Sequence, residues 1–135
     1  MKVKLTDIAD ELEMIFDDGI TFLNKETGEF LFLSREIDRD FDERIEEVEE
    51  SEDYVCLPGR FEINDFEIMK GFAYSRTESQ KNQLLDVLYG PKSYRRFKDK
   101  IYHLGIEQDY FDFRSEKLLD IAKNWCEVHH VDYEE

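Results

Sequence analysis

The sequence lacks the features of disulfide-rich, membrane-spanning and secreted proteins. Its only cysteines, Cys56 and Cys126, are too few for a disulfide-stabilised scaffold and fit reduced thiols in a cytosolic protein. No stretch approaches the roughly 18 uncharged apolar residues that a membrane-spanning helix needs. Residues 1–7 also lack the apolar core of a secretion signal. We therefore expect a cytoplasmic protein without a membrane span.

Basic residues are scarce relative to acidic ones. The chain of 135 residues has 18 lysines and arginines against 34 aspartates and glutamates, which gives a net charge of −16. A field of this sign repels polyanions, so we expect no non-specific binding to nucleic acid or to anionic membranes. With 41% hydrophobic and 14% aromatic residues, the chain still has enough apolar side chains to form a core. We therefore expect one domain over residues 1–135.

The spacing of apolar residues predicts an α+β fold that begins with a helix and a small antiparallel sheet. The first helix is indicated by four residues at helical spacing, Leu5, Ile8, Leu12 and Ile15. A hairpin is expected over residues 20–33, because two strand-like runs flank a turn in which Gly28 can take a positive φ. A third strand is expected at residues 53–57, before a Pro-Gly pair.

Capping residues predict the helices that follow the hairpin. Ser34 is the candidate cap of an acidic helix over residues 35–53, which contains 3 bases and 11 acids. Its apolar stripe would be Ile37, Phe41, Ile45 and Val48. The opposite face would be a solvated outer surface. Asn64 and Thr77 each begin a capping-box pattern, and Gly105 is a natural stop for a helix that starts near residue 93. A last helix would bury Phe111, Leu118, Ala122 and Trp125.

The basic-aromatic segment, residues 92–102, differs from its acidic surroundings. Residues 92–100 hold five bases and one acid, interleaved with aromatic side chains. The candidate binding residues are Tyr94, Arg95, Arg96, Lys98 and Tyr102. Arginine suits carboxylate or phosphate groups, and the rings could stack on nucleic-acid bases, although the net charge disfavours nucleic acid. The alternative is that these cations only balance the acidic half of the chain.

A second candidate site is the cluster of Cys126, His129 and His130. Their spacing would place a thiol and two imidazoles on one side of a helix, which together with Cys56 or His103 could hold zinc. The simpler interpretation is a buried cysteine followed by two histidines that favour a helix C-terminus. No phosphate-binding loop, nucleophile elbow or HExxH motif occurs, so we name no catalytic residue and no cofactor.

Four stretches of the chain carry a family resemblance. In order they are KVKLTDI at 2–8, FLNKETGE at 22–29, RRFKD at 95–99 with LGIE at 104–107, and FDFR at 111–114 with AKNWCE at 122–127. In this order and spread, the chain resembles a bacterial family catalogued as uncharacterised protein family 0158. The resemblance implies a small, acidic, intracellular bacterial protein of undefined function, and it supplies no catalytic residue.

These observations favour a non-catalytic interaction or regulatory protein whose partner is an unknown protein. It would use two surfaces of opposite charge, the basic-aromatic segment 92–102 and the acidic helix 35–53. One alternative is an acidic mimic of nucleic acid that binds a basic protein cleft. Another is a metal-dependent enzyme centred on Cys126, His129 and His130. Seven tyrosines and eleven phenylalanines are more than a minimal core needs, which also admits a homodimer.

Overall fold

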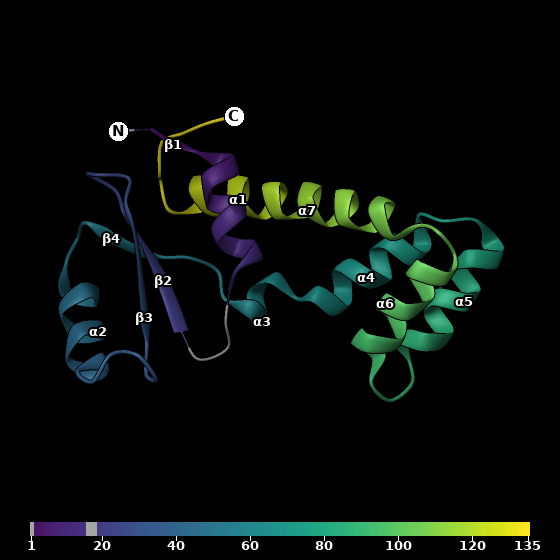
Figure 1. Ribbon diagram of the computed structural model, residues 1–135. Coiled ribbons are helices and arrows are strands. Elements are labelled where there is room, and N and C mark those ends of the chain that lie inside the picture. Colours follow the sequence, from purple (N-terminus) through teal and green to yellow (C-terminus); the bar gives the residue numbers. More distant parts are fainter. Residues whose placement is uncertain (1, 16–18) are drawn as a thin grey trace. The chain divides into compact units, whose positions relative to one another are not determined.

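The computed structural model describes residues 2–15 and 19–135, and contacts within the chain divide it into two compact units (Figure 1). The sheet unit consists of residues 1–63 and 118–135, and the helical unit consists of residues 64–117. The predicted α+β class is confirmed. The prediction of one domain over the whole chain stays a prediction.

The net negative charge is confined to one of these units. The sheet unit has 8 lysines and arginines against 25 aspartates and glutamates, a net charge of −17. The helical unit has 10 against 9, a net charge of +1. The boundary between acidic and near-neutral sequence therefore coincides with the boundary between the units.

The sheet unit contains the predicted antiparallel sheet. Its strands are β2 (Gly19–Asn24), β3 (Phe30–Ser34) and β4 (Tyr54–Cys56), and β2 lies between the other two. The predicted turn also forms, since Gly28 has φ +77° and Asn24 Oδ1 accepts from the backbone N–H of Glu26 at 2.9 Å. Phe22, Leu33 and Val48 form a buried cluster that joins the sheet to α2 (Phe41–Glu50).

The acidic helix is shorter at both ends than the sequence predicts, because the prediction is wrong for residues 35–40 and 51–53. Ser34 does not cap a helix; its carbonyl accepts from the backbone N–H groups of Ile37 and Asp38 at 3.3 and 2.8 Å. The Asp38 carboxylate accepts in return from the Ser34 N–H at 2.9 Å. Such local side-chain bonds offer the backbone an alternative to the helix. Ile37 is consequently 74% exposed and lies outside the apolar stripe.

Both ends of the chain contribute to the sheet unit. The predicted N-terminal helix is α1 (Leu5–Glu13), and its buried residues include the predicted Leu5, Ile8 and Leu12. Ile15, the fourth predicted residue, lies beyond the end of the helix. The sequence did not predict the short parallel pair of β1 (Val3–Lys4) and β5 (Tyr133–Glu134). After the single turn α3 (Arg60–Ile63), the unit is completed by the C-terminal half of α7 (Glu107–Val128), where Leu118 and Ala122 are fully buried.

The helical unit begins with the predicted caps. Its helices are α4 (Asp65–Tyr74), α5 (Glu78–Leu88), α6 (Ser93–His103) and the N-terminal half of α7. The side chains of Asn64 and Thr77 accept from the backbone N–H groups three residues on, as expected for N-caps. Gly105 takes φ +71° just after α6, which confirms the predicted stop. No helix in the described ranges is long and apolar enough to cross a membrane.

The core of the helical unit is aromatic. Phe72 of α4 is 2% exposed and meets three rings edge to face: Phe97, Tyr110 and Phe113, with centroid distances of 6.4, 5.3 and 5.5 Å. Phe111, which the sequence places in the buried stripe of the last helix, is instead 37% exposed. Tyr110 takes the core position one residue earlier. The prediction for Phe111 is wrong because the ring facing α4 belongs to its neighbour.

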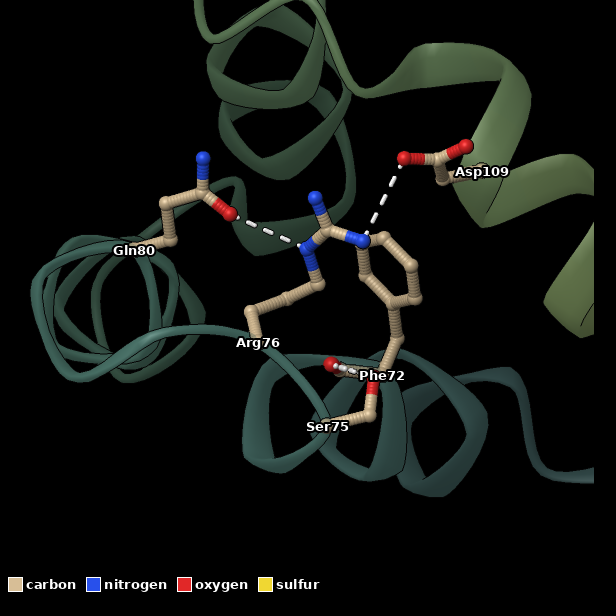
Figure 2. Close-up of polar contacts among 5 residues, drawn as sticks. All are labelled: Phe72, Ser75, Arg76, Gln80 and Asp109. Carbon is tan, nitrogen blue, oxygen red and sulfur yellow. Dashed lines mark hydrogen bonds and ion pairs between the residues drawn. The ribbon is translucent and has the colours of Figure 1, made fainter.

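Arg76 connects three helices of this unit (Figure 2). Its Nε donates to Gln80 Oε1 at 3.0 Å, and its Nη1 lies 3.3 Å from Asp109 Oδ2. The guanidinium carbon lies 5.3 Å from the centroid of the Phe72 ring. Arg76 thus links the end of α4 to the start of α5 and to the start of α7. Its guanidinium already has structural partners within the unit.

Candidate functional site

Four of the five candidate binding residues share one side of α6. Phe97 and Ile101 are fully buried and mark the side of the helix that faces the core. Helical geometry places positions 94, 98, 102 and 95 within an arc of about 100° on one flank of α6, which begins beside Ile101. Tyr94 is 52% exposed and Tyr102 is 69% exposed. We call Tyr94, Arg95, Lys98 and Tyr102 the α6 stripe.

Lys98 is held within the α6 stripe by aromatic rings. Its Nζ lies 5.4 Å from the centroid of the Tyr94 ring and 5.2 Å from that of Phe111 on α7. Both distances fall in the range of cation–π attraction. The exposed face of Phe111 therefore belongs to this surface, although the sequence analysis assigned Phe111 to the core.

Arg96 does not belong with its neighbour Arg95. It is half-buried, and a Cβ built at Gly90 would collide with its Nη1. Its guanidinium therefore packs against the Gly90 backbone in the turn before α6. Successive helical residues point about 100° apart, so of the two arginines only Arg95 lies on the stripe, and a binding role for Arg96 stays a prediction.

The cations of the basic-aromatic segment form no ion pairs within residues 64–117. Elsewhere in the unit Arg76 pairs with Asp109, and Arg114 pairs with Asp65 at 2.9 Å. In residues 64–117, all of which the structure describes, none of the five cations between Lys92 and Lys100 lies within ion-pair distance of a carboxylate. The alternative that these cations balance the acidic half of the chain stays a prediction, because that half belongs to the other unit.

The predicted metal cluster does not assemble. Cys126 is fully buried, and burial raises the pKa of its thiol to about 11, with Glu127 adding to the effect. His129 and His130 are exposed and follow the last residue of α7, and His130 leaves helical geometry with φ +56°. Across residues 2–15 and 19–135, no three histidine, cysteine or carboxylate side chains are grouped to hold a metal ion.

His130 ends α7. It has φ +56°, and its N–H bonds to Glu127 O while the N–H of Val131 bonds to Cys126 O at 2.8 Å. These two bonds, with a left-handed residue between them and a buried Val131 after it, form a Schellman motif. Glycine is the preferred residue at this position, because it adopts positive φ without the cost paid by a side chain.

Replacing His130 with glycine should therefore raise the free energy of unfolding by about 1 kcal/mol. Urea denaturation followed by circular dichroism measures the change. His129→Gly is the matched control. The backbone of His129 does not have a positive φ, so glycine relieves no strain there. A loss of stability in His130→Gly would show that the imidazole makes a contact more valuable than the relieved backbone strain.

A cavity of about 540 Å³ lies in the sheet unit, between residues 56–62 and the last turns of α7. It brings Cys56 and His129 to one site with Trp125. The sequence analysis considered Cys56 as a neighbour of the histidines but did not predict this cavity. Its two walls lie about 60 residues apart in the chain, and neither has a local motif that marks it as a wall.

Comparison with known proteins gives a family and no closer relative. No curated protein and no solved structure matches the chain significantly. The model of one family, described as an uncharacterised protein family (UPF0158), matches residues 1–134. The matched range covers nearly the whole chain and agrees with the resemblance seen in the four sequence stretches. The chain therefore belongs to uncharacterised protein family UPF0158.

Proposed function

We propose that this protein is a non-catalytic, cytoplasmic interaction protein that binds an acidic partner protein through the α6 stripe. The observation that carries the proposal is the state of Arg95. Arg76 and Arg114 form ion pairs in this unit, and Arg96 packs against Gly90. Arg95 is exposed and, within residues 64–117, makes no ion pair, so its guanidinium is available to a partner carboxylate.

The neighbours of Arg95 have the composition of a protein-binding surface. Tyrosine and arginine are the residue types enriched among the energetically important positions of interfaces. Tyr94 and Tyr102 offer exposed rings on either side of Arg95 along the helix. Lys98 is already positioned by two rings, so fixing it on binding costs less conformational entropy. The stripe thus combines cationic groups with rigid apolar area.

An acidic protein is a better partner for this stripe than nucleic acid. The chain carries a net charge of −16, and a polyanion approaching over long distances experiences that whole charge. A protein segment with a few carboxylates has a much smaller charge and can approach the stripe locally. Arginine also binds carboxylates in a two-pronged geometry that lysine cannot match.

The acidic face of α2 supports the second candidate function, mimicry of nucleic acid. Every carboxylate of this helix is exposed, while Val48 on the other side is buried. The acidic residues are Asp42, Glu43, Glu46, Glu47, Glu49 and Glu50. Helical geometry gathers them on one side, which a mimic needs, but any amphipathic surface helix would show the same pattern. The α6 stripe is therefore the stronger basis for a function.

The proposal predicts that Arg95→Glu lowers capture of a specific protein from bacterial lysate by roughly tenfold or more, as expected for a central interface arginine. Capture on the immobilised chain, after nuclease treatment, is quantified by mass spectrometry. Lys100→Glu is the matched control. It makes the same charge change on the same helix, on the other side of the buried face, and should leave capture unchanged.

Three results would contradict the proposal. Equal losses with Arg95→Glu and Lys100→Glu would indicate attraction to the charge of α6 rather than to the stripe. Loss of all captured partners on nuclease treatment would make the stripe a nucleic-acid site. Capture that survives Arg95→Glu but disappears with Glu46→Gln and Glu47→Gln would favour the acidic mimic. Circular dichroism spectra of each variant establish that the fold is retained.

A further inference from the structure

The cavity of the sheet unit has the size and lining of a small-molecule site. Its volume of about 540 Å³ lies within the range of roughly 300–1,000 Å³ typical of ligand pockets. One wall is formed by residues 56–62, which leave β4 and enter α3, and the other by residues 120–129 at the end of α7. Both walls belong to the sheet unit, so the site is independent of the α6 stripe.

The apolar part of the cavity is held in place by a cross-wall hydrogen bond. The indole Nε1 of Trp125 donates to the carbonyl oxygen of Cys56 at 2.9 Å, which joins α7 to the end of β4. Leu57 and Trp125 are both buried, and the imidazole of His129 lies 5.4 Å from the indole, centroid to centroid. A ligand would therefore meet apolar side chains that are already fixed, which lowers the entropic cost of binding.

The polar groups at the cavity carry negative charge from both walls. Glu62 lines it from α3 and Asp120 from α7, while the described lining residues include no lysine or arginine. Glu62 is oriented, since its Oε2 accepts from the backbone N–H of Gly59 at 2.9 Å. The pKa of the Cys56 thiol is affected by this environment. Partial burial raises the pKa, and the negative charges of Glu62 and Glu49 raise it further.

We infer that this cavity binds a small organic cation that has an apolar body and a primary ammonium group. The apolar body would lie against Leu57 and Trp125, and the ammonium group would lie between the carboxylates of Glu62 and Asp120. A carboxylate ligand would be repelled by the same two groups. The proposed ligand would be held by these contacts and not by a bond to the Cys56 sulfur, since a raised pKa lowers the fraction of the reactive thiolate.

The single tryptophan makes the inference directly testable. Trp125 is the only tryptophan of the chain, so selectively excited emission reports on this cavity alone. We expect n-hexylammonium to shift the emission of the full chain in a saturable way, because the alkyl group displaces water from the indole. Hexan-1-ol and hexanoate share the alkyl body. Hexan-1-ol should produce a weaker shift of the Trp125 emission, and hexanoate should produce no shift. No saturable shift with hexylammonium, or an equal shift with hexan-1-ol, would overturn the inference.

Variants separate a local site from general attraction to an acidic protein. Asp120→Asn should weaken hexylammonium binding by about fivefold, the size expected for an ion pair of this kind. Glu46→Gln removes one negative charge from α2, outside the cavity, and should leave binding unchanged. Equal weakening in both variants would show that the amine responds to net charge, which would refute the site.

Alkylation of Cys56 provides a second readout in the same samples. Cys56 is exposed at the cavity and Cys126 is buried, so iodoacetamide should modify Cys56 first in the native chain. Saturating hexylammonium should slow this modification several-fold, whereas hexanoate should not. An unchanged rate under conditions in which Trp125 emission is saturated would place the amine elsewhere and overturn the assignment.

Discussion

Replacing Phe72 with alanine should destabilise the helical unit by about 3–5 kcal/mol, the cost typical of truncating a fully buried aromatic side chain. The ring lies among Phe97, Tyr110 and Phe113, all in edge-to-face geometry. The guanidinium of Arg76 covers part of the same ring. The substitution removes these contacts together and leaves a cavity among the remaining rings. Urea denaturation, with hydrogen exchange across residues 64–117, measures the loss.

Tyr110→Phe is the matched control for Phe72→Ala, because it keeps a ring in the same cluster. Tyr110 is buried, and its hydroxyl has no hydrogen-bond partner among the residues that the structure describes. Removing an unpaired buried hydroxyl is expected to be neutral or stabilising by up to about 1 kcal/mol. If Tyr110→Phe instead destabilises the unit as much as Phe72→Ala, the hydroxyl rather than ring packing would dominate this core.

The elements predicted best from the sequence are those specified by neighbouring residues. Asn64 and Thr77 cap α4 and α5 through bonds that reach only three residues along the chain. Gly28 and Gly105 mark a turn and a helix end because each takes a positive φ there. In all four cases the decisive interaction is local, so the sequence contains all the information that the prediction needs.

The errors arose where side chains compete for the backbone or where distant segments meet. Asp38 and Ser34 close a turn, which removes residues 35–40 from the predicted acidic helix. The pairing of β1 with β5 joins the two ends of the chain, and neither strand has enough residues to show a periodic pattern. Helical spacing also could not decide between Tyr110 and Phe111, because both are aromatic and adjacent.

The candidate sites follow the same division. The α6 stripe was recognisable because its residues lie on one helix, and the structure only had to separate Arg96 from the others. The predicted cluster of Cys126, His129 and His130 assumed one continuous helical face, whereas α7 ends at Val128 and His130 has φ +56°. The cavity beside Trp125 could not be predicted, since its walls are joined by a hydrogen bond between residues 69 positions apart.

The second large effect is expected at Trp125, where alanine should destabilise the sheet unit by about 3–5 kcal/mol. The indole is 6% exposed and is one of the side chains that line the cavity. Its Nε1 also donates to the carbonyl oxygen of Cys56, which joins α7 to β4. Cys56 is itself paired with Phe22 of β2. Alanine removes both the packing and the hydrogen bond. Because the variant has no tryptophan, circular dichroism in urea is the appropriate measurement.

Trp125→Phe separates the two contributions. Phenylalanine keeps a buried ring but cannot donate to the Cys56 carbonyl, so its cost should be closer to the roughly 1 kcal/mol of one hydrogen bond, plus a smaller loss of packing. A large difference between alanine and phenylalanine would show that apolar packing holds α7 against the sheet unit. Equal costs would mean that the single cross-wall hydrogen bond dominates. In that case the cavity wall would depend on one donor, and Trp125→Phe should weaken binding of hexylammonium as well.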